Sequence, residues 1–292
     1  MKNRSVVMLA LLLGLTGVRA PAEEPPKNLR QRLADKLEQD KAAELKVQNR
    51  GAATLGGKTA PKAAAKPDGH AWGYAGDGAP DRWGELSPEN RLCALGTRQT
   101  PIDIRDTLKV DLERIQFDYR VSRFSVIDTG HAIQANVEPG NFLSVAGRRF
   151  ELQQFHFHKP SEERINGRAF DMVAHLVHKD PEGKLAVVAV LLERGQDQGQ
   201  VQQVLNSLPL EKLQLQWAPD EIDVGQLLPT DRAYYTFMGS LTTPPCSEGV
   251  LWLVLRQPVP IGAQQLAIFG KLYPMNARPT QPSGGRIIKE SL

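Results

Sequence analysis

Residues 69–292 predict a mainly β protein with minor α content, folded as a single domain with peripheral helices. Short apolar stretches of strand length alternate with turns that contain Gly, Pro or Asp, and most of these stretches are enriched in β-branched residues. Only two segments show a convincing helical period, so we expect few helices, lying at the edge of the β structure.

The predicted strands follow one another along the chain, and turn residues separate them. They are FSVIDT (124–129), HAIQANV (131–137), RFELQQFHFH (149–158), MVAHLVH (172–178), KLAVVAVLLE (184–193) and VLWLVLRQP (250–258). The two predicted helices are GQVQQVLNSL (199–208) and IGAQQLAIFGKL (261–272).

The N-terminus has the pattern of a removable export signal. A positively charged start is followed by an apolar run at residues 6–15 and by Val18 and Ala20, small residues that suit a signal-peptidase site. The apolar run is shorter than the roughly 20 residues that span a bilayer. We therefore expect a signal peptide at residues 1–20, no membrane span after its removal, and a periplasmic or secreted protein.

Residues 21–68 differ in composition from the domain that follows. They are rich in Ala, Lys, Glu and Gln and contain no aromatic residue. Leu29, Leu33 and Leu37 share one helical face, but only over about three turns, which is too short to predict a coiled coil. We expect a charged, flexible tail and linker.

Charge and cysteine content narrow the class of protein. The net charge of +3 is too small to indicate binding to nucleic acid, and no basic stripe with interleaved aromatic residues is present. Cys93 and Cys246 lie far apart, and both follow the export signal. Two buried free thiols are the alternative, but an oxidising compartment favours one disulfide between them.

The stretch QFHFHKPSEE (154–163) contains two histidines with the spacing of a metal site. Side chains at i and i+2 of a strand project from one face, so His156 and His158 project together, while Phe155 and Phe157 face a core. The pair alone is a weak signal, because a strand with two polar residues on its wet face has the same pattern.

A third histidine strengthens the metal hypothesis. His175 and His178 lie three apart in AHLVH, on opposite faces of a predicted strand, so only one can join the pair. His175 has apolar neighbours and needs a partner, whereas His178 approaches a turn and is expected to be structural. Three neutral imidazoles suit Zn²⁺ and leave one position open for a water that the metal acidifies to a nucleophilic hydroxide.

Eight motifs, in order along the domain, resemble those of the α-class carbonic anhydrases of the exported bacterial kind. They are HAWGY (70–74), QTPIDI (99–104), GHAIQ (130–134), QFHFHKPSEE, AHLVHKD (174–180), LAVVAV (185–190), SLTTPPCSEGV (240–250) and NARPTQP (276–282). The resemblance implies one large twisted, mostly antiparallel β-sheet with zinc at the base of a cone-shaped cleft. It also implies reversible hydration of carbon dioxide to bicarbonate and a proton by zinc-hydroxide attack.

The resemblance assigns catalytic roles to residues of this sequence. Thr242 resembles the threonine that accepts a hydrogen bond from the zinc-bound hydroxide, and Glu162 resembles the glutamate that accepts the threonine's own proton. His131 resembles the proton shuttle, since an imidazole titrating near neutrality can carry a proton outward. The implied zinc ligands are His156, His158 and His175.

The resemblance also describes the surroundings of the site. The expected contacts with CO₂ or bicarbonate are Val177, Val187, Leu241, Thr242, Thr243 and Trp252. The expected water network and partners of the histidine ligands are Tyr74, Gln134, Gln154 and Asn276. Cys93 and Cys246 match the disulfide of exported family members.

One position near the metal ligands departs from the family pattern. The ligand that corresponds to His175 usually has a glutamate two residues earlier, which accepts its second N–H, and here that position is Val173. Partners of this kind typically change metal affinity or activity by about 10- to 100-fold. We therefore expect altered zinc retention, an altered pKa of the zinc-bound water, or a water in place of the glutamate.

Two other classes of protein stay open on the sequence. His156, His158 and Glu162 form an HxHxxxE pattern that also fits a cupin-type enzyme, in which the glutamate would bind Fe or Mn. A catalytically inactive, carbonic-anhydrase-like binding module is the second alternative. For the enzyme we expect small-molecule substrates, inhibition by sulfonamides and anions, and no nucleic-acid partner; a homodimer stays open.

Overall fold

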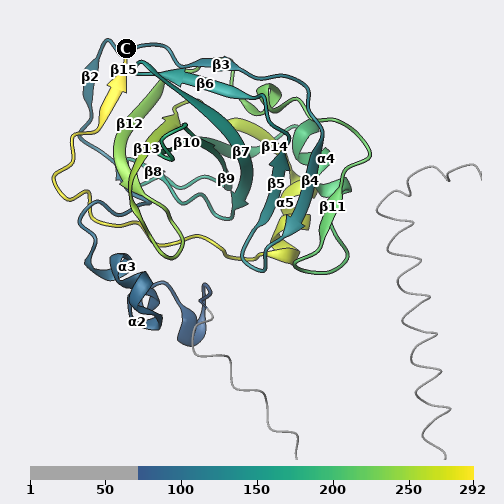
Figure 1. Cartoon of the computed structure of the whole chain (residues 1–292), viewed down its shortest axis with the longest axis horizontal. Helices are drawn as coiled ribbons and strands as arrows, with labels where there is room; N and C mark the ends of the chain where they lie inside the picture. The colour runs from purple at the N-terminus through teal and green to yellow at the C-terminus, as the bar shows by residue number, and fades with distance from the viewer. Residues whose placement is uncertain (1–71) are drawn as a thin grey trace, which may run out of the picture.

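Residues 72–292 are described by a computed structural model, in which one large curled sheet dominates (Figure 1). The sheet has 13 strands and few helices lie against it, as the sequence predicts. No helix in this part of the chain is long and apolar enough to cross a membrane. The predicted signal peptide (1–20) and tail (21–68) lie outside the described residues.

The strands are longest at the centre of the sheet, where β7 and β10 each have 11 residues. They are β1 (Asp103–Ile104), β2 (Leu108–Val110), β3 (Gln116–Asp118), β4 (Phe124–Asp128), β5 (Ile133–Val137), β6 (Phe142–Val145), β7 (Arg148–His158), β8 (Arg164–Ile165), β9 (Met172–Lys179), β10 (Leu185–Gly195), β11 (Leu215–Trp217), β12 (Tyr234–Ser240), β13 (Glu248–Leu255), β14 (Val259–Gly262) and β15 (Lys289–Ser291). The α-helices are α2 (Trp83–Leu86), α3 (Leu92–Leu95), α4 (Gly199–Asn206) and α5 (Ala263–Leu272).

The sheet is mostly antiparallel, with the order β11-β4-β5-β7-β9-β10-β13-β12-β15-β2. β14 pairs with β10, and β6 pairs with both β7 and β3. The parallel pairings in this sheet are β10 with β13, β10 with β14, and β15 with β2. β1 and β8 form a separate parallel pair beside it. The antiparallel neighbours β7 and β9 therefore carry both histidine motifs of the sequence.

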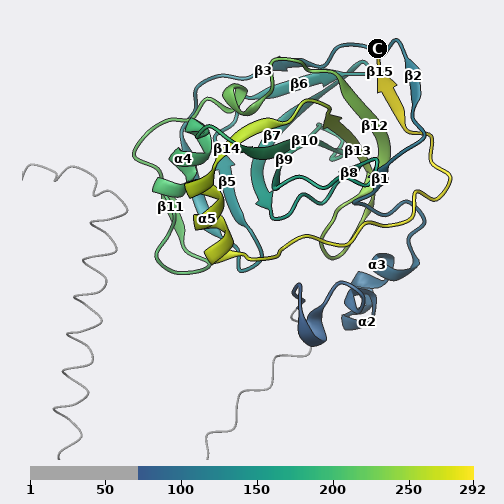
Figure 2. The ribbon, with the colours of Figure 1, turned by 180° about the vertical axis from the view of Figure 1, so that it is seen from behind.

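The central strands alternate their side chains between two apolar cores, one on each face of the sheet. Phe155 and Phe157 of β7 belong to the larger core, which α4 and α5 cover (Figure 2). Val173 of β9 belongs to the smaller core on the other face. A β-bulge between Leu152 and Gln154 shifts the register of β7, so that Leu152 and Phe155 share a face although they lie three apart.

The strands and helices predicted from periodicity are present, with small differences at their ends. β5 begins two residues later than predicted, because Thr129 donates its N–H to Ala132 in a turn at 3.0 Å. β13 ends before Pro258, and α4 ends at Asn206. The four-residue helices α2 and α3 were not predicted, since so short a segment shows no period.

A disulfide ties the α2–α3 region to a loop of the large sheet. Cys93 of α3 is bonded to Cys246, which lies 153 residues later, with their Cα atoms 5.0 Å apart. Both sulfurs lie in a small apolar cluster with Trp83. The guanidinium of Arg278 donates to the carbonyl oxygen of Cys93 at 2.9 Å. The disulfide therefore fixes the loop that follows β12, which also carries Thr242.

Candidate metal centre

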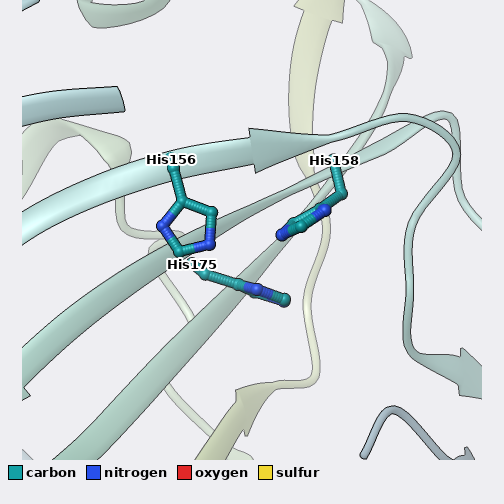
Figure 3. A group of neighbouring side chains, drawn as sticks. All are labelled: His156, His158 and His175. Atoms are coloured by element: carbon teal, nitrogen blue, oxygen red, sulfur yellow. The ribbon is translucent and has the colours of Figure 1, made fainter. Parts of the chain in front are cut away.

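Three histidines from two adjacent strands converge on one point. His156 and His158 project from β7, and His175 of β9 lies directly opposite His156 in the antiparallel register. The ring centroids lie 4.9 to 5.5 Å apart. One ring nitrogen of each residue lies within 4.8 Å of the others, and Figure 3 shows the rings turned toward a common centre. The alternation of side chains along a strand brings these residues together, as predicted.

Each ring has one nitrogen bonded outward, which leaves the other free for a metal. Nδ1 of His158 lies 2.7 Å from the carbonyl oxygen of Asn276, which can only accept, so this nitrogen carries the proton. Nδ1 of His156 donates in the same way to Oε1 of Gln154 at 2.9 Å. Nε2 of His175 lies 3.1 and 3.2 Å from the two carboxylate oxygens of Glu163.

The donor set fits a metal ion. Nε2 of His158 is fully buried and has no hydrogen-bond partner, a costly state for a polar atom unless a ligand satisfies it. Burial, with His175 adding to it, lowers the pKa of His156 to about 3, and burial also holds the pKa of His158 well below its ordinary value. These rings are therefore neutral at physiological pH, which is the form that binds a metal.

His175 has a different electrostatic environment from the other two histidines. Burial alone would lower its pKa, but the carboxylates of Glu163 and Glu162 outweigh burial, and the pKa of His175 is raised. In the protein without metal, the two buried glutamates therefore favour the protonated form of this ring more than those of His156 and His158.

Glu162 lies beside His158 and His175, with one carboxylate oxygen hydrogen-bonded and the other without a hydrogen bond. Its Oε1 accepts the backbone N–H of Arg278 at 2.8 Å, whereas Oε2 is buried without a partner at hydrogen-bond distance. Burial, with a contribution from Glu163, raises the pKa of Glu162 to about 7, against the lowering effects of His175, Arg278 and the nearby Thr242 hydroxyl. Thr242 is itself buried.

A small cavity of about 40 Å³ opens beside the histidines. Since about 10–15 Å³ of such cavity volume holds one water, the cavity has room for a molecule of a few heavy atoms. Its lining combines apolar side chains with two threonines and two of the histidines. It consists of His156, His175, Val177, Val187, Leu241, Thr242, Thr243 and Trp252. All six residues predicted to contact the substrate therefore line one cavity.

His131, the predicted shuttle, lies outside the ligand cluster. Its ring stacks on Trp72 with centroids 3.7 Å apart and an interplanar angle of 11°. Its carbonyl oxygen accepts from Nδ2 of Asn276 at 3.0 Å, and the backbone carbonyl of Asn276 in turn serves His158. Burial and then Lys212 lower the pKa of His131, and Asp128 opposes them.

The residues predicted for the water network lie around the same centre. Gln134 of β5 is the register partner of His156, and its amide donates to Oδ1 of Asn136 at 2.7 Å. The hydroxyl of Tyr74 is buried without a hydrogen-bond partner, and burial and then Glu162 raise its pKa.

Sequence reasoning missed the role of one residue, Glu163. The absence of a glutamate at position 173 led us to expect altered zinc retention or a water in its place, yet Glu163 contacts Nε2 of His175. The available signal was the second acidic residue in the SEE stretch. His178 instead faces the larger core, where its Nε2 pairs with the Tyr119 hydroxyl at 2.6 Å, as expected for a structural histidine.

A mostly antiparallel sheet holds three convergent histidines, two of them buried, beside a small cavity, and this defines the class of proteins with a three-histidine group suited to a metal. The sequence model of a family described as eukaryotic-type carbonic anhydrase, the α class, matches residues 78–292. The chain belongs to this carbonic anhydrase family, and CO₂ hydration is the activity that membership supports.

Individual relatives agree with this membership. A carbonic anhydrase of Pectobacterium carotovorum is 43% identical over 218 residues, which cover 74% of this chain and 89% of the relative. A carbonic anhydrase of Neisseria gonorrhoeae is also 43% identical, over 80% of this chain and 92% of the relative. The solved α-carbonic anhydrase of Thermovibrio ammonificans, in complex with the inhibitor sulfanilamide, superimposes with a TM-score of 0.74 at 39% identity, over 75% of this chain and 99% of that chain.

Proposed function

We propose that this enzyme uses a zinc ion, held by His156, His158 and His175, to interconvert carbon dioxide with bicarbonate and a proton. The observation that carries the proposal is the convergence of three histidine rings. Each ring turns one nitrogen toward the common centre and hydrogen-bonds through the other, and two of the rings line the small cavity. Three protein ligands leave a coordination position open, which is the arrangement of a catalytic site. Bound zinc supplies a water with a pKa near neutrality, an effect for which carbonic anhydrases are the standard example.

Thr242 and Glu162 orient the reacting oxygen in this proposal. In the working enzyme, the Oε2 of ionised Glu162 would accept a hydrogen bond from the nearby Thr242 hydroxyl, so the Thr242 oxygen would be left to accept a hydrogen bond from the nucleophile. This arrangement directs a lone pair of the nucleophile toward the substrate carbon. A cation at the histidines favours the ionised form of Glu162.

The cavity beside the histidines suits an uncharged substrate. Val177, Val187, Leu241 and Trp252 form a wall without charge, and carbon dioxide needs no polar anchor there. Bicarbonate differs from it by the added oxygen and a negative charge. The two threonines of the lining can contact the polar product, while the apolar side chains favour its release.

Zinc content and CO₂ hydration test this function directly. The purified protein is expected to bind one zinc ion per chain and to accelerate CO₂ hydration in stopped-flow assays, with inhibition by sulfanilamide in proportion to the zinc bound. Iron or manganese held with Glu162 as a ligand would support the cupin-type alternative. Stoichiometric zinc without hydration would support the inactive binding module.

His131 is the proposed proton shuttle, because Asn276 connects it to His158 and because it is partly exposed, with its ring stacked on Trp72. Replacing it with alanine is expected to lower kcat by roughly 10²-fold in weak buffer and to leave kcat/KM nearly unchanged, since proton transfer follows the hydration step. The neutral ring accepts the proton, and its pKa is lowered, so kcat of the unsubstituted enzyme should stay high below the ordinary histidine midpoint of 6.5.

Stopped-flow assays at several concentrations of an imidazole buffer provide the control for His131→Ala. A small diffusible base should restore most of the lost kcat in the variant and change the unsubstituted enzyme little. An unchanged kcat in weak buffer would show that another group carries the proton.

We also propose that the enzyme works outside the cytoplasm. The buried disulfide supports this location, because such bonds persist in oxidising compartments and are rare in the cytosol. The charged start and apolar run of the N-terminus agree with it.

A further inference from the structure

Glu163 is a fully buried carboxylate without a part in the mechanism described above. It lies between β7 and β8, next to Glu162, and its side chain is completely inaccessible to solvent. An ionised carboxylate in such a position is costly unless an opposite charge or hydrogen-bond donors compensate for it. The groups that contact the Glu163 carboxylate therefore indicate its role.

Among residues 72–292, the only side chain that forms an ion pair with Glu163 is His175. Both carboxylate oxygens face Nε2 of that ring, at 3.1 and 3.2 Å. No lysine or arginine of this part of the chain forms an ion pair with it. The charge of Glu163 is thus directed at one histidine of the metal centre.

The segment that carries Glu163 is held by hydrogen bonds on both sides. The carbonyl oxygen of Glu163 accepts from the Ser161 hydroxyl at 2.9 Å, and that hydroxyl accepts the N–H of Phe170 at 2.8 Å. On the other side, the N–H of Arg164 donates to the carbonyl oxygen of Ile102 at 3.2 Å. A side chain on such an anchored segment can hold a ring in one orientation.

Position 173 cannot supply this contact. Val173 lies two residues before His175 on the same face of β9, is fully buried, and packs in the smaller apolar core. Its side chain has no hydrogen-bonding atom. The carboxylate that the family pattern puts on the strand is therefore supplied here by a residue that precedes β8.

We propose that Glu163 is the positioning residue for His175 and sets how firmly the centre retains zinc. It accepts the Nε2 proton, which fixes the tautomer that points the Nδ1 lone pair at the metal, and its negative charge strengthens the ring as a donor. This proposal rests on the proposed function in that the three histidines hold zinc, but it concerns retention of the metal and not the reaction.

Zinc affinity and zinc release separate this role from a structural one. Competition with a chromophoric chelator should show that Glu163→Ala weakens zinc binding by about 10- to 100-fold and speeds metal release correspondingly. Glu163→Gln, which keeps an acceptor oxygen and loses the charge, should fall between Glu163→Ala and the unsubstituted protein. In spectra of ¹⁵N-histidine-labelled zinc protein, Glu163→Ala should alter the Nε2–H signal of one ring.

Glu290→Gln is the matched control. Glu290 is another buried glutamate, and its side chain hydrogen-bonds with Arg256 and Thr107 and not with the three histidines. It is expected to leave zinc affinity unchanged. If the unsubstituted protein binds zinc and both Glu163 variants retain it within about twofold, the positioning role is wrong while the proposed function stands. If the unsubstituted protein binds no zinc, the proposed function itself fails, and this inference fails with it.

Discussion

Alanine at position 175 is expected to remove zinc from the protein and to lower the rate of CO₂ hydration by at least about three orders of magnitude. Two histidines on one strand cannot complete the site, and without the metal the pKa of the water nucleophile rises from about 7 to far above neutrality. The same change removes the histidine that pairs with Glu163 and lies near Oε2 of Glu162, so both glutamates are left buried without that partner. Breaking a buried pair in this way costs about 3 to 5 kcal/mol.

The measurements for His175→Ala are zinc content, stopped-flow hydration, and urea unfolding of the metal-free protein. His178→Ala is the matched control, because His178 lies on the same strand, is equally buried, and pairs with Tyr119 on the other face. The control should lose some stability and keep stoichiometric zinc. Full zinc content and normal turnover in His175→Ala would contradict the assignment of the centre.

The double variant Cys93→Ser/Cys246→Ser is expected to lower the free energy of unfolding by about 2 to 5 kcal/mol. The disulfide closes a loop between residues 153 apart, so its loss returns a large conformational entropy to the unfolded chain. Cys246 also lies four residues after Thr242, and its N–H donates to the carbonyl oxygen of Thr243 at 2.9 Å. A looser loop would weaken the alignment of Thr242, so turnover should fall together with stability.

Chemical unfolding with and without a reductant measures the contribution of the disulfide. The reductant should bring the unsubstituted protein to the midpoint of the double variant and leave the double variant unchanged. A difference of less than about 1 kcal/mol would mean that the apolar packing around Trp83 holds this region without the covalent link.

Much of the fold could be predicted because the central strands are long and regular. The alternation in β7 and the β-branched runs of β9 and β10 indicate which side chains are buried, because each side chain of a strand points to one of the two faces of the sheet. The bulge in β7 was not predictable, because its cause is the pairing with β9 and not a local pattern. The same holds for the order of strands in the sheet, which depends on contacts between distant segments.

For the site, the sequence by itself determined which histidines could meet. Side chains alternate between the two faces of a strand, so His156 and His158 share a face, and His175 can be assigned to a face in the same way. This reasoning needs no knowledge of the neighbouring strands. Only the tertiary structure decided what supports them. Glu163 reaches His175 across a turn between strands, and the carbonyl of Asn276 reaches His158 from 118 residues away. Such partners follow no local period, so the fold has to bring them together before they can be recognised.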